Sequence, residues 1–225
     1  MKKDRALLFD FDGLILDTET PSFEAWRTIF REQGADLAWQ DYIQCVGTHN
    51  TAFDAVSHLE GLTGRSQARA DLNQRHLESA RITIEGQALL PGVVELLRDA
   101  ERQNVKCAVA SSSDRDWVEG HLIRLGIRSR FAALVSRRDV AKVKPAPDLF
   151  LKALDLLGVE ARNAVVFEDS LNGIRAARAA GVYCVAVPNS VTRALPLEEA
   201  DLLLPSLAVK SLSEILDLAS RRGRD

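Results

Sequence analysis

The chain has 225 residues, of which 46% are hydrophobic and 27% are charged, and its formal net charge is −3. Such a chain is long enough to bury a sizeable core, and its length is typical of one main domain with a smaller insertion. The acidic balance argues against nucleic-acid binding, and no apolar run approaches the length of a membrane span. The charged start lacks the pattern of a signal peptide, so we expect a cytoplasmic monomer that binds neither nucleic acid nor membranes.

The predicted elements begin with a strand at residues 6–9, which is followed by helical patterns without a convincing strand up to Leu90. These helices are predicted at residues 22–33, 39–46, 51–62 and 67–84. Further strands are predicted at residues 105–110, 133–135, 164–167, 184–187 and, as a weak sixth, 202–204, with amphipathic helices between them.

Strands that alternate with helices are typical of a parallel sheet that is covered on both faces. We therefore predict an α/β fold in two parts. Residues 1–15 and 91–225 form the parallel-sheet core, and residues 16–90 form a small all-helical domain inserted after the first strand.

Two carboxylates, Asp10 and Asp12, follow the first strand directly, and Gly13 comes next. Side chains two residues apart on an extended chain point to the same side, so both acids could face one small volume. Two such charges repel each other unless a cation is present or one group is protonated. Mg²⁺, a hard cation that prefers oxygen ligands, suits the first case.

Other polar groups are predicted at the same edge of the sheet, because ligands of open α/β sheets bind beyond the carboxyl ends of the strands. Taken singly, each has a plain structural role, such as a helix cap, a turn or a solvated side chain. Their joint occurrence at one edge favours a functional site. The groups are Ser111 and Ser112 in a serine run, Lys144, and Glu168 with Asp169.

This set supports phosphoryl transfer. Asp10, at the end of the strand, is the better-fixed nucleophile and would form an aspartyl-phosphate. Asp12, on the turn, would protonate the leaving oxygen and then activate water. Lys144 would neutralise charge on the phosphate oxygens, and Ser111 would hold the phosphate in place.

Four segments resemble the motifs of the haloacid dehalogenase superfamily, in its phosphatase and β-phosphoglucomutase branch. They are FDFDGLILDTE, VASSS, KPAPDLF and FEDSLNGIRAARAAG, and they occur in the family's order over essentially the whole chain. The resemblance implies a Rossmann-like core, a helical cap over the site, and catalytic roles for Asp10, Asp12, Ser111 and Lys144. It also implies Mg²⁺ held by Asp10, the backbone carbonyl of Asp12, and Asp169, with Glu168 nearby.

The branch contains both phosphatases and sugar-phosphate mutases. In the family's mutases the cap supplies a histidine and an arginine, and the matching positions here carry Ser22 and Asn50. Neutral asparagine is a poor partner for a phosphate dianion, although His49 beside it could partly substitute. We therefore predict a Mg²⁺-dependent phosphatase of a small phosphorylated metabolite, such as a sugar phosphate. A β-phosphoglucomutase-type mutase is the alternative.

Substrate selection is expected to fall to residues near the core–cap junction and to the GTHN loop. The candidates are Thr18, Glu19, Thr48, His49 and Asn50, together with Ser112. A receiver-type signalling module or a catalytically inactive member of the family would also carry parts of this pattern. The Asp10–Asp12 pair and the long helical insertion favour an enzyme.

Overall fold

The computed structural model describes residues 4–43 and 53–222. In these residues, six parallel strands form one sheet in the order β3-β2-β1-β4-β5-β6. The predicted strands are all present, with ends displaced by one residue at most, and the α/β fold class is confirmed. The strands are β1 (Ala6–Phe9), β2 (Lys106–Ala110), β3 (Ala133–Val135), β4 (Ala164–Glu168), β5 (Tyr183–Ala186) and β6 (Leu202–Leu203).

Both faces of the sheet are buried, which is why its strands read as continuous apolar runs. Along β1, Leu7 and Phe9 belong to one hydrophobic cluster, whereas Ala6 and Leu8 belong to the other. The first cluster includes residues of α5 (Val93–Arg102), α6 (Arg115–Arg124) and α9 (Leu212–Arg221), and the second includes residues of α7 (Asp148–Leu157) and α8 (Leu171–Ala179).

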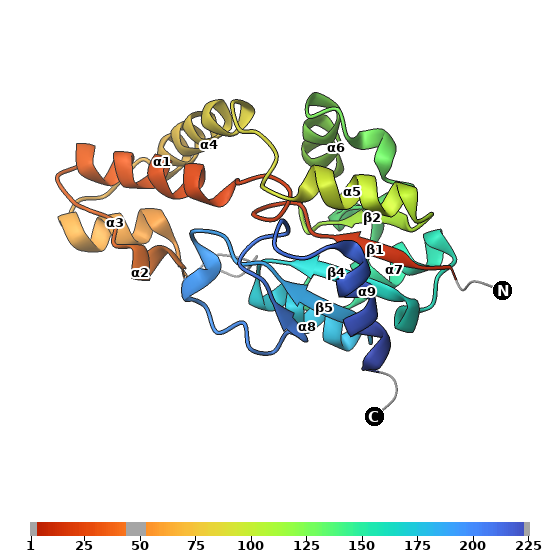
Figure 1. The fold of residues 1–225 in the computed structure, drawn as a ribbon. Helices are drawn as coiled ribbons and strands as arrows, with labels where there is room; N and C mark the ends of the chain where they lie inside the picture. Colours follow the sequence, from red (N-terminus) through yellow and green to blue (C-terminus); the bar gives the residue numbers. More distant parts are fainter. Residues whose placement is uncertain (1–3, 44–52, 223–225) are drawn as a thin grey trace.

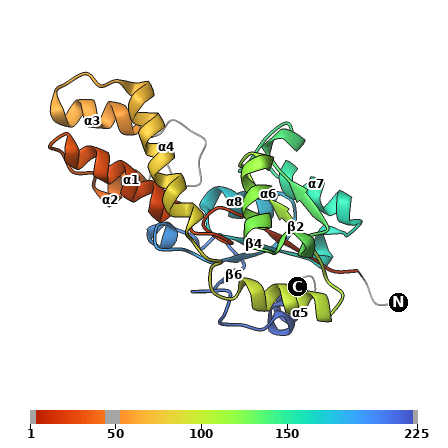
Figure 2. The same ribbon diagram turned by 90° about the horizontal axis from the view of Figure 1, so that it is seen from above.

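The helical segment forms a separate unit beside the sheet, and both Figure 1 and Figure 2 show it set apart from the strands. It has its own buried cluster, in which Phe30 and Leu59 are fully buried. None of the described helices is long and apolar enough to cross a membrane. The helices of this unit are α1 (Glu19–Glu32), α2 (Trp39–Tyr42), α3 (Ala55–Thr63) and α4 (Arg69–Glu85).

The helix α1 begins three residues earlier than the sequence pattern predicts, because Pro21 does not prevent helix formation there. A proline in the first turn is tolerated, since its missing N–H would have no partner in the helix. The shift matters because it places Glu19 and Ser22 on the first turn of α1.

Two chain segments join the helical unit to the core, and they run together. Leu16 forms isolated bridges with Asp12 and with Leu89, and the backbone N–H of Leu90 donates to the carbonyl of Ile15 at 3.0 Å. The domain boundaries at residues 15/16 and 90/91 stay a prediction. They fall where these two paired segments cross between the core and the helical unit.

The strand order reverses at β1, which has β2 on one side and β4 on the other. In such sheets the crevice at the reversal point, outside the carboxyl ends of the strands, is the usual ligand site. Asp10 follows β1 directly, while Glu168 ends β4 and Asp169 follows it. The fold therefore brings these acids from two distant parts of the sequence to one crevice.

Candidate active site

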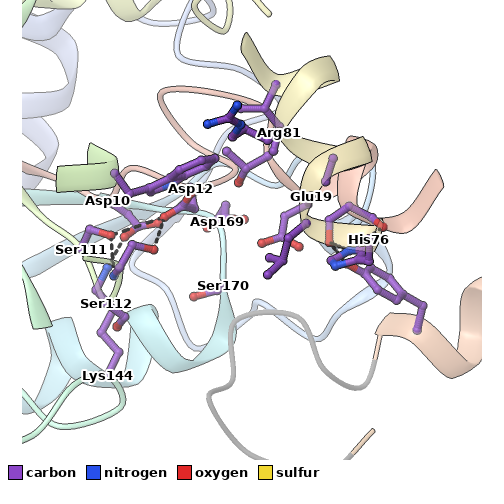
Figure 3. Close-up of a pocket in the computed structure, with 18 residues that line it drawn as sticks. Asp10, Asp12, Glu19, His76, Arg81, Ser111, Ser112, Lys144, Asp169 and Ser170 are labelled. Carbon is purple, nitrogen blue, oxygen red and sulfur yellow. Dashed lines mark hydrogen bonds and ion pairs between the residues drawn. The ribbon is translucent and has the colours of Figure 1, made fainter. Parts of the chain in front are cut away.

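A buried acidic cluster lies at the reversal point. Carboxylate oxygens of Asp10, Glu168 and Asp169 all lie within 4.8 Å of one another. Lys144 is buried beside them: its Nζ lies 2.6 Å from Glu168 Oε1 and forms an ion pair with Asp10. Figure 3 shows the Lys144 side chain extending toward Asp10. One ammonium group thus faces three carboxylates.

The pKa values of the cluster reflect this excess of carboxylate groups over ammonium groups. Burial, only partly opposed by Lys144, raises the pKa of Asp10 to about 7. Burial and the neighbouring Glu168 carboxylate raise the pKa of Asp169 well above its ordinary value. Burial alone would lower the pKa of Lys144, but Asp10 and Glu168 outweigh it and raise that pKa. The donor set, three converging carboxylates, fits a hard divalent cation.

The turn after β4 holds Glu168 in place. Its Oε2 accepts hydrogen bonds from the backbone N–H groups of Asp169 (3.1 Å) and Ser170 (3.2 Å), and from the Ser170 hydroxyl (3.0 Å). Gly173 packs against this carboxyl group so closely that a Cβ there would lie 1.8 Å from Glu168 Cδ. Any side chain at this position would collide with the Glu168 carboxyl group, so the FEDSLNG segment needs glycine here.

The turn after β1 is fixed in a similar way by Asn189, which follows β5. Asn189 Nδ2 donates to Asp169 Oδ2 at 2.7 Å and to the carbonyl of Gly13 at 3.1 Å. Gly13 has a φ of 79°, and a Cβ at this position would lie 2.5 Å from both of those side-chain atoms. Only glycine satisfies both the backbone angle and the close approach.

The second acid of the pair lies apart from the acidic cluster. Asp12 Oδ2 accepts from the Ser113 hydroxyl at 2.6 Å and, at the limit of a hydrogen bond, from Ser111 at 3.5 Å. Asp12 Oδ1 accepts from Trp117 Nε1 at 3.0 Å. The two donors on opposite oxygens fix the carboxylate while one face of it remains on the cavity.

These groups line a cavity of about 430 Å³ between the sheet edge and the helical unit. Glu19 and His76 lie on its far wall, across from Ser111 and Lys144 (Figure 3). Burial and the neighbouring Asp12 carboxylate raise the pKa of Glu19 to about 8. Burial lowers the pKa of His76 to about 4, so its imidazole is neutral at pH 7.

Sequence comparison decides the family. The model of the haloacid dehalogenase-like hydrolases matches residues 7–187. The chain belongs to the haloacid dehalogenase-like hydrolase family. Its relatives in this family include YhcW of Bacillus subtilis, provisionally named a phosphatase, which is 40% identical over 95% of this chain and 96% of its own length.

Two further relatives carry more specific names. The fructose-1-phosphate phosphatase YqaB of Escherichia coli is 35% identical over 80% of this chain and 95% of its own. The crystal structure of CbbY from Rhodobacter sphaeroides in complex with xylulose 1,5-bisphosphate has a TM-score of 0.71 and 31% identity, covering 93% of this chain and 98% of CbbY. Together these matches identify the chain as an enzyme, a phosphoric monoester hydrolase of this family.

The structure brings most of the predicted site residues together. Glu168 lies beneath the cavity and is fully buried. Three predicted substrate selectors, Thr48, His49 and Asn50, lie outside the described residues. The predicted residues that line the cavity are Asp10, Asp12, Thr18, Glu19, Ser111, Ser112, Lys144 and Asp169.

Several cavity and turn residues were not predicted from the sequence. Asn189 follows β5, so the same strand-end rule that identified Glu168 would have found it. Trp117 lies in the first turn of α6, shortly after the serine run, but an aromatic residue there is more often part of a core. His76 lines the cavity because α4 packs against α1, and Tyr42 of α2 lines it beside Phe23 of α1; no local pattern signals either contact.

Proposed function

We propose that this family member is a Mg²⁺-dependent phosphatase that hydrolyses a small phosphorylated metabolite, a sugar phosphate, through an aspartyl-phosphate on Asp10. The observation that carries this proposal is the convergence of Asp10, Lys144 and Asp169 beneath a cavity, with Asp12 held at its side. The sugar-phosphate class is supported by the name of the relative YqaB.

The metal would be held by Asp10, Asp169 and the backbone carbonyl of Asp12, with Glu168 behind them. The geometry fits this set, because the three carboxylates converge and the Asp12 side chain is turned toward Trp117 and Ser113. When bound, Mg²⁺ would neutralise charge on the phosphate oxygens. Lys144 offsets at most one of the three buried carboxylates, and a bound divalent cation would balance the others and the incoming phosphate.

The protein groups divide the reaction between them. A carboxylate oxygen of Asp10 attacks phosphorus, and the bond to the ester oxygen breaks. Asp12 gives a proton to that leaving oxygen and later takes one from the attacking water. Lys144 and the Ser111 hydroxyl stabilise the negative charge on the phosphate oxygens during both steps.

The helical unit, residues 16–90, would act as a cap over this site. It supplies the far wall of the cavity, and its closure would exclude bulk water and position the leaving group. The paired crossing at Leu16 and Leu89 is the expected hinge.

A sugar-phosphate mutase is the alternative function, and one contact supports it. Ser22 stands where the family's mutases have a histidine in the cap. His76 Nε2 lies 3.0 Å from Ser22 Oγ, so an imidazole from another helix lies at this part of the cap. Product analysis separates the two functions. A phosphatase releases inorganic phosphate from β-glucose 1-phosphate, whereas a mutase converts it to glucose 6-phosphate.

The proposal is tested by phosphate release from p-nitrophenyl phosphate and from glucose 6-phosphate. Activity should require Mg²⁺, disappear with EDTA and return when Mg²⁺ is restored. Asp10→Asn should abolish turnover, while Asp36→Asn, a matched change at an exposed residue of the helical unit, should not. Full activity in EDTA, or in the Asp10→Asn protein, would overturn the mechanism.

A further inference from the structure

One face of α6 runs from the candidate site to the end of α4. Trp117, His121 and Arg124 are spaced by four and three residues on this helix, so their side chains lie on one face. At one end of this face, the Trp117 indole N–H donates to Asp12 Oδ1 at 3.0 Å. At the other end, Arg124 donates to backbone carbonyl groups of the helical unit. The three side chains therefore connect Asp12 with the helical unit.

Arg124 is held in place by the backbone at the end of α4. Its Nη1 donates to the carbonyl of Gln87 at 3.1 Å, and its Nη2 donates to the carbonyl of Ile84 at 3.3 Å. Ile84 lies in the last turn of α4, where a nearby cation is favoured by the partial negative charge of the helix end. An exposed arginine usually samples many conformations, but these two hydrogen bonds fix the plane of this guanidinium group.

His121 is buried between Arg124 and Trp117. The Nε and Nη2 atoms of Arg124 lie 3.3 Å and 3.2 Å from His121 Nδ1. A guanidinium group only donates, so Nδ1 accepts and the imidazole carries its hydrogen on Nε2. The imidazole meets the Trp117 ring at 77°, with centroids 4.3 Å apart, and Phe11 stacks on it with centroids 6.1 Å apart. Arg124 thus fixes the rotation of the imidazole, and the imidazole packs against the indole and fixes its position.

The position of the indole matters because a carboxyl group rotates readily about its terminal bond. Ser113 holds Asp12 Oδ2 at 2.6 Å, and Trp117 holds Oδ1. An acid transfers its proton efficiently only while it stays within hydrogen-bond reach of the leaving oxygen. A displaced indole would release one of the two oxygens and leave Asp12 free to turn away.

We propose that His121 and Arg124 are positioning residues for Asp12, and that they act through Trp117 by joining α6 to the end of α4. This inference rests on the proposed function, because that function assigns proton transfer to Asp12. Neither His121 nor Arg124 lines the cavity, so their role is one of geometry and not of contact with the substrate.

Kinetics with two leaving groups test the proposal. The ratio kcat/KM covers the steps up to release of the alcohol, in which a sugar oxygen needs a proton and p-nitrophenolate does not. We expect Arg124→Gln and His121→Phe to lower kcat/KM about ten-fold for the sugar phosphate that is hydrolysed best, and about two-fold or less for p-nitrophenyl phosphate. Arg130→Gln, which removes an arginine paired with Glu101, is the control and should change neither value. Equal losses on the two esters would overturn the proposal.

A double-mutant cycle shows whether Arg124 acts through Trp117. Trp117→Phe combined with Arg124→Gln should lower kcat/KM for the sugar phosphate no more than Trp117→Phe alone, about ten-fold. Independent contributions would instead multiply to about a hundred-fold, and that result also overturns the proposal. Arg124 is exposed, so its variant is informative even where His121→Phe does not fold.

The indole N–H of Trp117 gives a readout that needs no catalysis. The chain has three tryptophans, so the spectrum of isotope-labelled protein contains three indole signals, and Trp117→Phe identifies the one that matters. We expect hydrogen exchange of this N–H to accelerate about ten-fold in Arg124→Gln, while the other two indoles keep their rates. Unchanged exchange at Trp117 contradicts the proposal. If no ester is hydrolysed but this exchange accelerates, the proposed function fails and the positioning by α6 stands.

Discussion

The indole N–H of Trp117 donates a hydrogen bond to Asp12 Oδ1 at 3.0 Å, on the oxygen opposite the one that Ser113 contacts. The donor comes from α6, 105 residues along the chain from its acceptor. Its effect is to fix the acid to which the proposed mechanism assigns proton transfer. Trp117 is therefore a positioning residue for Asp12.

Trp117→Phe removes this donor while keeping an aromatic ring. We expect kcat for an alkyl phosphate to fall about ten-fold, because a mobile Asp12 protonates the leaving oxygen less often. p-Nitrophenolate leaves without a proton, so kcat for p-nitrophenyl phosphate should fall less. Trp39→Phe, a half-buried tryptophan outside the cavity, is the control. Equal losses on both esters would show that Trp117 contributes only to structure.

Lys144→Met leaves the buried carboxylates of Asp10 and Glu168 without their counter-charge. Breaking a buried ion pair in this way typically costs about 3–5 kcal/mol, so the free energy of unfolding should fall by that order. Urea denaturation in EDTA measures the loss, and added Mg²⁺ should recover part of it. Lys152→Met, on the exposed face of α7, should change stability by about 0.5 kcal/mol or less. A loss at Lys144 as small as that at Lys152 would contradict the ion-pair account.

Gly173→Ala and Gly120→Ala form a matched pair of glycine substitutions within helices. A Cβ at Gly173 would collide with the Glu168 carboxyl group, whereas nothing lies within 4 Å of a Cβ at Gly120. We expect the first change to cost about 1–3 kcal/mol of stability through overpacking and to lower activity. The second should stabilise α6 by about 0.5–1 kcal/mol. Thermal unfolding monitored by circular dichroism compares them, and changes of the same sign would be inconsistent with the packing at Glu168.

His76 makes stability depend on pH. Its pKa in the folded protein is about 4, compared with 6.5 for the ordinary group, so the unfolded chain takes up the proton first as the pH falls. The contribution of the buried neutral imidazole is therefore fully present above pH 6.5 and is lost between pH 6.5 and about 4. His76→Gln removes this titration, so the stability difference between wild type and variant should shrink as the pH falls through that window. Denaturation curves at four or five pH values measure it, and a constant difference would show that His76 does not titrate in this range.

Much of the fold and of the candidate site could be predicted from the sequence. Short continuous apolar runs indicated the strands, and polar residues directly after them marked the ligand edge. The carboxyl ends of parallel strands lie at the same edge of a sheet. This rule placed Asp10 and Glu168 near each other, although they are 158 residues apart in the sequence. Local pattern sufficed here because each strand end is a local feature and the sheet aligns those ends.

Other features were decided only by the tertiary structure. The start of α1 at Glu19, the Trp117–Asp12 hydrogen bond and the position of His76 against Ser22 follow from how helices dock on the core and on each other. The way two helices dock depends on the packing of many side chains at once, so no sequence pattern at a single position predicts it. The sequence alone thus determined which edge of the sheet carries the candidate site, whereas the packing of α1 against α4 decided the wall that faces it.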